Sequence, residues 1–377
     1  MIQTPGLLLT ILAFALVIGP LVFIHELGHY LAGRWCGVKA EAFSIGFGRE
    51  IAGWTDRRGT RWRLALLPLG GYVKFAGDMS AAGRSDPDWL LLPPEERAQT
   101  FQAKSVWQRA IIVAAGPAIN FLLAILILTG FALAYGDAQT PAVVGQAMPG
   151  TAAAQAGLRP GDRIDALGGR HVDTFEDMVR YVKLRAGERV RIDYVRGGQA
   201  DHVAAQIGTQ EQRDRFGNVY KVGLLGLAPA QPVVRPVGLL EAPVVAVRRT
   251  GEIVEMMAET IGQIVSGRRS VRELGGPLAI AKVSGEQITL GWDAFVFLLA
   301  LVSINLGFIN LLPVPMLDGG HLLFYLIEAV RQKPVGAQAQ EWAYRGGLAA
   351  VLALMMLVTF NDLGNFGLWR HLAGLIG

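Results

Sequence analysis

The sequence predicts a multi-pass α-helical membrane protein with four transmembrane helices, a membrane-associated β ribbon and an inserted α+β domain. Three observations lead to this fold class. The chain of 377 residues is 52% hydrophobic and 18% charged, with a mean hydropathy of +0.36, whereas soluble globular proteins carry about 25% charged residues. Four apolar runs approach or exceed the length needed to cross a bilayer. A stretch of mixed polarity, about 138 to 231, separates the second run from the third.

The first apolar run covers residues 6 to 33 and contains no charge from 6 to 24. A run of this length is expected to form a bilayer-spanning helix. Because no Lys or Arg precedes it, it lacks the charged start of a cleaved signal peptide. We therefore expect a retained helix in residues 1–33.

Three later runs complete the predicted membrane part. The second covers about 110 to 135 and is assigned to the segment 107–136. The third covers 294 to 317, with a shorter apolar piece at 321 to 327, and is assigned to 292–330. The fourth, at about 343 to 360, is short for a span of about 20 residues and is assigned, with the C-terminal tail, to 331–377.

The orientation of these helices follows from Lys and Arg in the loops, which favour the cytoplasmic side. The loop at 34–106 holds 11 of them, and the connection after the third run holds more, whereas the N-terminal tip has none. We expect the 34–106 loop inside, and both termini and the long segment between the second and third runs outside.

Two soluble regions have recognisable patterns. In the 34–106 loop, residues 43 to 48 and 61 to 75 are rich in β-formers and glycine, which predicts an antiparallel ribbon at the membrane surface. In the outer segment, we expect a small α+β domain at 137–231. Its strands are predicted at 143–145, after the turn that begins at 157, and at 189–195. Thr174 is the expected cap of a helix, with Asp177 three residues later.

A linker at 232–291 follows this domain and contains apolar residues at helical spacing. Arginines flank that pattern, including Arg248, Arg249, Arg268 and Arg269. Two interpretations stand with nearly equal weight: an amphipathic helix lying in the membrane interface, or a helix packed on the soluble domain.

The segment His25-Glu26-Leu27-Gly28-His29 lies at the end of the first apolar run. The pattern H-E-x-x-H places two imidazoles at i and i+4 on one helical face, where both can bind one Zn²⁺ with the glutamate as general base. Ionisable groups at membrane depth are functional by default, since burying them is costly. We therefore predict His25 and His29 as metal ligands and Glu26 as the catalytic base.

A catalytic zinc site needs a third protein ligand. Asp318 is the prime candidate, because it follows an irregular stretch in which Pro313 and Pro315 cannot continue a helix. Irregular backbone at membrane depth is tolerated where it lines a wet cavity. His321 is an alternative ligand, and the alternative role for Asp318 is a turn or cap residue.

The roles of two asparagines have two interpretations each. The amides of Asn305 and Asn310 are suited to holding a substrate or an oxyanion, or to bonding neighbouring helices. Asn120, after Gly116 and Pro117, is expected to join helices. The single cysteine, Cys36, excludes an intrachain disulfide. No basic block interleaved with aromatics occurs, so we expect no nucleic-acid partner.

Taken together, these motifs resemble the site-2 protease family of intramembrane zinc metalloproteases. They are H-E-x-x-H in the first helix, G-P-x-x-N at Gly116 to Asn120, and N-x-x-P-x-P-x-x-D-G at Asn310 to Gly319. The ribbon segments at 43–48 and 70–74, and the segment at 275–281, are similar to those of its bacterial RseP-like branch. The outer domain resembles a PDZ domain with a permuted chain order.

The resemblance implies roles for individual residues. His25, His29 and Asp318 would hold one zinc ion per chain, Glu26 would be catalytic, and Asn305, Asn310, Pro313 and Pro315 would accommodate substrate. Leu225, Gly226 and Leu227 would form the peptide-end loop of the PDZ-like domain.

It also implies a function and a location. The family cleaves transmembrane segments of single-span proteins, typically after another protease has removed their outer part; in the RseP-like branch these are anti-sigma factors and signal-peptide remnants. The expected location is the bacterial inner membrane, with the lipid bilayer itself as a partner. The best-known members of this branch carry two PDZ domains, whereas 138–231 has room for one, so a single domain is expected to filter substrates differently.

Two other functions compete with this one. A membrane zincin that cuts soluble chains would take its third ligand from a Glu on a following helix, and no such Glu is evident; Glu41 and Glu50 lie in the predicted ribbon. A PDZ-bearing scaffold with structural zinc would need a closed four-ligand site, and a fourth ligand is not obvious either.

Overall fold

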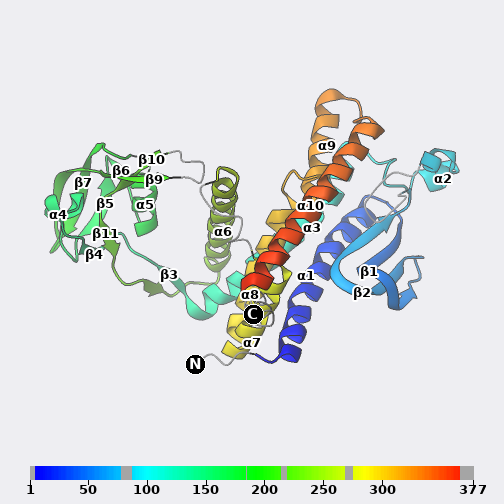
Figure 1. The fold of residues 1–377 in the computed structure, drawn as a ribbon, viewed down its shortest axis with the longest axis horizontal. Helices are drawn as coiled ribbons and strands as arrows, with labels where there is room; N and C mark the ends of the chain where they lie inside the picture. The colour runs from blue at the N-terminus through cyan, green and yellow to red at the C-terminus, as the bar shows by residue number, and fades with distance from the viewer. Residues whose placement is uncertain (1–4, 78–86, 184, 214–218, 268–274, 366–377) are drawn as a thin grey trace, which may run out of the picture. The chain divides into compact units, whose positions relative to one another are not determined.

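The computed structural model describes residues 5–77, 87–183, 185–213, 219–267 and 275–365. The chain divides into two compact units (Figure 1). The helical unit comprises residues 1–128, 247–255 and 271–377, and the inserted unit comprises 129–246 and 256–270. Arg268 and Arg269, predicted to flank the apolar pattern of the linker, lie outside the described residues.

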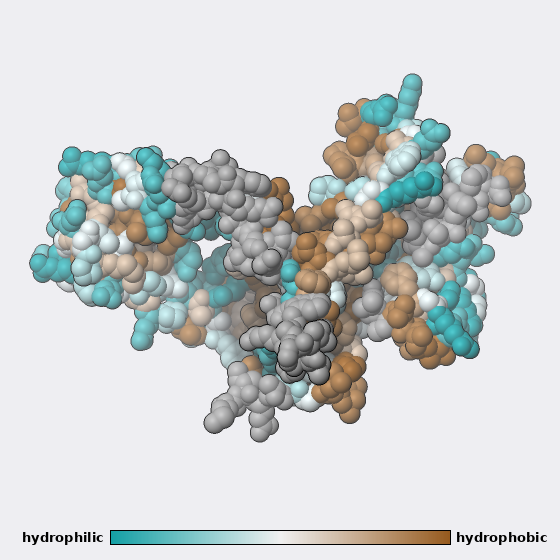
Figure 2. Space-filling model, viewed as in Figure 1, coloured by the Kyte–Doolittle hydropathy of each residue, from teal (hydrophilic) through white to brown (hydrophobic). Residues whose placement is uncertain are grey.

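Four helices in the described ranges are long and apolar enough to cross a membrane, and each overlaps one of the four predicted runs, although the third helix ends at Asn310 and not at 317. They are α1 (Leu7–Trp35), α3 (Val106–Tyr135), α8 (Trp292–Asn310) and α10 (Ala337–Asn365). The fourth run is short in sequence, yet α10 has 29 residues, because polar residues on both sides of the run are helical as well. On the face shown in Figure 2, hydrophobic residues form patches in the region of the helical unit.

Two shorter helices complete the helical unit. α9 (Asp318–Arg331) follows α8 after an irregular turn, as the prolines predicted, and α7 (Pro277–Leu290) contacts α1, α8 and α10. The carboxylate of Asp362 on α10 accepts hydrogen bonds from the N–H groups of Gly276 and Ala279, which holds the first turn of α7. A short 3₁₀ helix (Pro87–Leu91) and α2 (Pro94–Arg97) lie in the loop before α3.

The helix expected in the linker is confirmed as α6 (Ala242–Val265), and a second helix that was not predicted, α7, follows it. Gly276 and Pro277 favour a new helix start, since proline is well suited to the first helical position. α7 packs on α1 within the helical unit, where Gly285 lies against Thr10. Ala242 and Val245 at the start of α6 pack on Ala132 of α3. The two interpretations of the location of α6, in the membrane interface or packed on the soluble domain, stay predictions.

The predicted ribbon is confirmed as two antiparallel strands, β1 (Ala40–Thr55) and β2 (Arg61–Phe75). Phe43 pairs with both Trp62 and Val73, so the ribbon folds back on itself. This buries Phe43, which stacks on Trp62 and meets Tyr30 of α1 edge to face. The ribbon is thereby packed against the helix that carries H-E-x-x-H.

The inserted unit contains the predicted α+β domain. A sheet in the order β6-β5-β7-β8 and three strand pairs, β10-β9, β11-β4 and β12-β3, enclose a core of buried aliphatic residues. Its elements are β3 (Asp137–Gln139), β4 (Val144–Ala147), α4 (Ala152–Gln155), β5 (Arg163–Leu167), β6 (Arg170–His171), α5 (Phe175–Lys183), β7 (Arg189–Arg196), β8 (Gln199–Gln206), β9 (Gly208–Arg213), β10 (Val219–Leu224), β11 (Leu227–Pro229) and β12 (Val233–Arg235).

Two local predictions in this domain are confirmed. The Thr174 hydroxyl accepts from the Asp177 N–H, and the Asp177 carboxylate accepts from the Thr174 N–H, a reciprocal cap that starts α5. The strand expected at 189–195 is β7.

One ion pair in the domain was not predicted. The buried Asp162 carboxylate accepts two hydrogen bonds from Arg196 of β7 at 2.7 Å and one from the Arg159 N–H. Burial raises the pKa of Asp162, but these hydrogen bonds and the guanidinium charge lower it below its ordinary value of 3.8.

Candidate metal centre

The two histidines of H-E-x-x-H lie one helical turn apart on α1 and face α3. Gly28, between them, lies so close to the Ala115 carbonyl of α3 that any side chain there would clash. This close contact seats the ligand face of α1 directly on α3. The Nε2 atoms of His25 and His29 are 3.2 Å apart.

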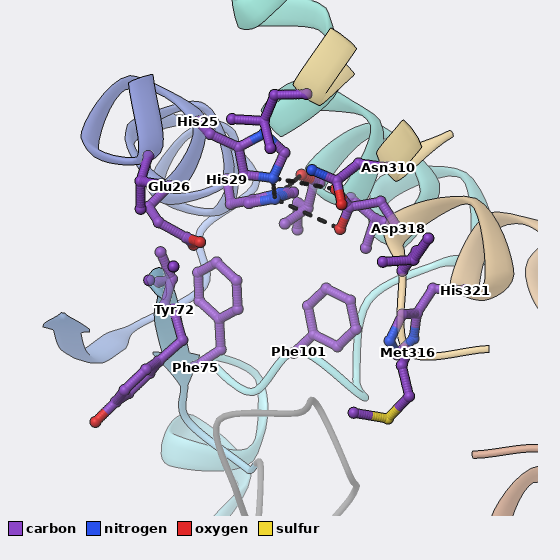
Figure 3. A pocket seen from close by; sticks show the side chains of 18 of the residues that line it. His25, Glu26, His29, Tyr72, Phe75, Phe101, Asn310, Met316, Asp318 and His321 are labelled. Carbon is purple, nitrogen blue, oxygen red and sulfur yellow. Dashed lines mark hydrogen bonds and ion pairs between the residues drawn. The ribbon is translucent and has the colours of Figure 1, made fainter. Parts of the chain in front are cut away.

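The turn between α8 and α9 brings Asp318 to the same point (Figure 3). Met316 in this turn has φ +92°, and Asp318 is the first residue of α9. Its Oδ2 lies 3.2 Å from His25 Nε2, and its Oδ1 lies 3.5 Å from His29 Nε2. The positive φ of Met316 is a strained backbone angle for a residue other than glycine. Strain of this kind persists where the surrounding structure fixes it, often at functional sites.

The three side chains fit a tetrahedral zinc ion. Ligands bound at the usual zinc distances and at tetrahedral angles are separated by about 3.4 Å. His25 Nε2 lies 3.2 Å from both His29 Nε2 and Asp318 Oδ2, and with one ligand atom from each residue the three atoms lie within 4.8 Å of one another. Among the described residues, this trio is the one His, Cys, Asp and Glu group close enough to hold a metal ion. Two imidazoles and one carboxylate leave a fourth position for water or substrate, as catalytic zinc sites require.

Each histidine has a partner on its other ring nitrogen. His29 Nδ1 lies 2.9 Å from the Ile112 carbonyl oxygen of α3. His25 Nδ1 lies 3.1 Å from the side-chain amide of Asn120, also on α3. Partners of this kind orient ligand imidazoles and set which nitrogen carries the proton.

Glu26 lies on the adjacent side of α1 and is 8% exposed. In Figure 3 its carboxylate points into a cavity that the metal ligands also line. Gly71 of β2 makes room for it, since a Cβ there would lie 2.8 Å from Glu26 Cγ. The ribbon therefore forms one wall of the chamber in which the predicted base lies.

This cavity has a volume of about 620 Å³ and a largely apolar lining. Besides the H-E-x-x-H residues, it is lined by ribbon residues and by the end of α8 with the turn that follows. Asn310 and Met316 both belong to the lining, and Figure 3 shows Asn310 beside Asp318.

Not all predicted substrate residues reach the cavity. Asn305 is half-buried on α8 and outside the lining, because five residues of helix turn it about 140° away from Asn310. Pro313 and Pro315 do not line the cavity either; Pro315 packs against Gly320 and Gly347. These two prolines shape the turn before Asp318, and their contact with substrate stays a prediction.

His321, the alternative ligand, lines the cavity but is not part of the metal group. Its Nδ1 lies 3.0 Å from the Tyr344 hydroxyl on α10. Asp318 begins α9 and its carboxylate points at both histidines, whereas His321 is nearly one turn further along.

Sequence reasoning missed the contacts that three positions make around the centre. Asn120 joins helices as expected, since it contacts His25 of α1 and Ser303 of α8, while Gly116 and Gly71 make room for His29 and Glu26. The signal for Asn120 was its distance of four residues from Gly116, about one helical turn, because both then face the same neighbour. Nothing in the sequence singled out Gly71 from the neighbouring Gly70.

A second concave site lies in the inserted domain. Leu225, Gly226 and Leu227, the predicted peptide-end loop, line a groove of about 180 Å³ together with α5 and β10. The carbonyl groups of Leu225 and Gly226 accept from Ala153 and Met148. Within the described ranges, their N–H groups donate to no backbone carbonyl, so they are available to an anionic group at the end of the groove.

A model of peptidase family M50 matches residues 13–354. A protein of Agrobacterium fabrum that is named a zinc metalloprotease is 46% identical over 94% of this chain and 96% of its own length. The metalloprotease MmpA of Caulobacter vibrioides is 37% identical over 98% of this chain and 99% of its own length.

Solved structures similar to the chain include PDZ domains. The PDZ domain of an SdrC-like protein from Listeria monocytogenes is 18% identical, with a TM-score of 0.19, and the match covers 24% of this chain and 88% of that domain. A related domain from Listeria innocua has a TM-score of 0.20, covering 25% of this chain and 99% of that domain. At these scores the PDZ-like character of the inserted domain stays a prediction.

Proposed function

Because this chain belongs to peptidase family M50, the site-2 protease family of zinc metalloproteases, we propose that it hydrolyses peptide bonds within the transmembrane segments of single-span membrane proteins. One observation carries the proposal: His25, His29 and Asp318 converge beside a buried Glu26, and the first two belong to a helix apolar enough to cross a membrane.

The chemistry divides between the metal and the side chains around it. A zinc ion held by His25, His29 and Asp318 would act as a Lewis acid and make water nucleophilic near neutral pH. Glu26 accepts the proton of the attacking water and delivers it to the leaving amine. Its place inside a cavity with few polar groups keeps this proton transfer local.

The remaining chamber positions the peptide. Asn310 presents an amide beside Asp318, where it can donate to the carbonyl under attack. The wall formed by Phe47 and Tyr72 of the ribbon is apolar and suited to side chains of a membrane segment. A helical substrate must unwind locally to offer a single carbonyl, and an apolar chamber of this size is suited to such an extended segment.

We assign the groove of the inserted domain to recognition of a peptide end. Its walls are formed by Met178, Val179 and Val182 of α5 and by Leu225, with the free N–H groups of the 225–226 turn at one end. This arrangement suits an aliphatic terminal residue and its carboxylate. Substrates would then be proteins already cut by another protease, anti-sigma factors and signal-peptide remnants among them.

The location proposed is the bacterial inner membrane, in contact with lipid. The Lys and Arg of residues 34–106 support a cytoplasmic ribbon, which leaves both termini and the inserted domain on the outer side.

The test is cleavage of a tagged single-span protein, shortened on its outer side, by wild type and Glu26→Gln in the same membranes. A product formed by wild type alone, and abolished by a zinc chelator, supports the proposal. Cleavage of a soluble unfolded chain but of no membrane segment would instead favour a zincin acting outside the bilayer. If the Glu26→Gln protein keeps the function of wild type, the chain would instead be a scaffold whose zinc is structural.

A further inference from the structure

The side chain of Asn120 occupies a closed position between three helices. It belongs to α3 and is fully buried. Its backbone carbonyl accepts a hydrogen bond of 2.8 Å from the Ser303 hydroxyl of α8, and its side-chain amide reaches His25 of α1. The residue is therefore held from behind by α8 while it faces a predicted metal ligand.

The two ends of this amide are not equivalent for His25. As placed in the structure, Nδ2 lies 3.1 Å from His25 Nδ1, and Oδ1 is buried with no partner. An N–H of the amide can donate only to an Nδ1 that carries a lone pair. The proton of a neutral imidazole then lies on Nε2, which is the atom that points at His29 and Asp318.

A nitrogen that carries a proton cannot bind a metal ion, so a ligating Nε2 requires the proton on Nδ1. Exchanging the amide oxygen and nitrogen of Asn120, which differ little in size and shape, resolves the conflict. Oδ1 then accepts from Nδ1–H, and Nδ2 takes the buried position that Oδ1 held. The neighbouring ligand already shows this arrangement, since His29 Nδ1 faces a carbonyl oxygen, that of Ile112.

We propose that Asn120 is a positioning residue of the metal centre. Its amide oxygen accepts a hydrogen bond from His25 Nδ1–H, which holds the ring with Nε2 unprotonated and aimed at the metal. The inference rests on the zinc site of the proposed function and not on any substrate, so its test needs no cleavage assay.

The experiment compares zinc binding by the full-length chain in detergent, measured by competition with a chelator of known affinity. Asn120→Leu keeps the volume of the side chain but has no acceptor. Asn120→Asp keeps an acceptor oxygen at the same position. Ser303→Ala is the matched control, because it removes the other polar contact of Asn120 and leaves the amide beside His25.

We expect Asn120→Leu to bind zinc about 10-fold to 100-fold more weakly, the usual effect of removing a partner of a metal ligand. Asn120→Asp and Ser303→Ala should stay within about threefold of wild type. Thermal unfolding of the chelator-treated proteins separates the positioning of His25 from a purely structural contact between helices. A purely structural contact would lower the unfolding midpoint of both Asn120 variants alike. Equal zinc affinity for Asn120→Leu and wild type, or equal losses for Leu and Asp, would overturn the proposal.

Discussion

Gly116 of α3 lies against the imidazole of His29 on α1, so close that a Cβ on Gly116 would overlap Nε2 and Cε1 of the ring. The absence of a side chain at this position is thus what allows His29 to point at His25 and Asp318. The same helix supplies the Ile112 carbonyl and Asn120 to the two ligand rings. α3 therefore orients the predicted ligands of α1 without contributing a ligand of its own.

Gly116→Ala is expected to weaken zinc binding by at least about tenfold, because the added methyl displaces the His29 ring. Alanine is favoured over glycine in a helix interior by about 1 kcal/mol, so a loss cannot be attributed to helix propensity. Gly130→Ala on the same helix is the control, since a Cβ there meets nothing within 4 Å. Chelator competition on both variants measures the effect, and equal affinities would contradict the steric argument.

Much of this arrangement was predictable from the sequence. His25 and His29 are four residues apart, so helix geometry alone places them on one face. Asp318 was identified because prolines in an apolar run imply irregular backbone. The spacing of Asn120 from Gly116 places both on one helix face but does not identify His25 as the partner, since a buried amide in a membrane helix can bond any neighbouring helix. The hydrogen bonds that hold the first turn of α7 come from Asp362, 86 residues beyond Gly276, a contact that local patterns do not contain.

Gly71→Ala is expected to lower cleavage on the order of a hundredfold and to leave zinc binding unchanged. The Cβ would approach Glu26 Cγ and the Ser44 carbonyl, each at 2.8 Å, and a displacement of about 1 Å near reacting groups costs this much rate. Cleavage rate and zinc content are measured on the same preparation. Gly19→Ala, on α1 with open space around it, should match wild type, and a loss of zinc in Gly71→Ala would show that the ribbon supports the ligands instead.

Asp318→Ala and Glu26→Gln should separate metal binding from proton transfer. Removing the Asp318 carboxylate takes away one of three converging ligand groups, so zinc occupancy is expected to fall. Glu26→Gln keeps the trio and loses the proton acceptor, so zinc stays near wild type while cleavage falls about 10²-fold to 10⁴-fold. Metal analysis of the purified proteins decides the matter, and equal zinc retention in both variants would remove Asp318 from the ligand set.

The Asp162–Arg196 pair should make the stability of the inserted domain depend on acid. Because folding lowers the pKa of Asp162 below 3.8, its contribution is fully present above about pH 3.8 and is lost as the pH falls through the lower folded value. Amide hydrogen exchange of β5 and β7 in the full chain, corrected for intrinsic rates, should show protection falling over this range.

Asp162→Asn should lower the free energy of opening, measured by hydrogen exchange at neutral pH, by about 2 kcal/mol, the usual contribution of hydrogen bonds to a charged group. The same substitution should make this free energy less dependent on pH in the acid range. Asp165→Asn removes an exposed pair with Arg163, which is expected to contribute little. If the protection of Asp162→Asn falls with decreasing pH in the same way as that of wild type, other carboxylates cause the pH dependence.

Val179→Glu should block the groove of the inserted domain without unfolding it. Val179 lines the groove and is 37% exposed, so a carboxylate there is tolerated by the fold but repels a peptide carboxylate and disfavours an aliphatic end. We expect binding of a labelled peptide with a terminal valine to weaken at least about tenfold, measured by fluorescence polarisation on the full chain. Val233→Glu, on exposed β12, is the matched control. Unchanged zinc content with lost peptide binding would place recognition in this groove, whereas equal binding by both variants would refute that assignment.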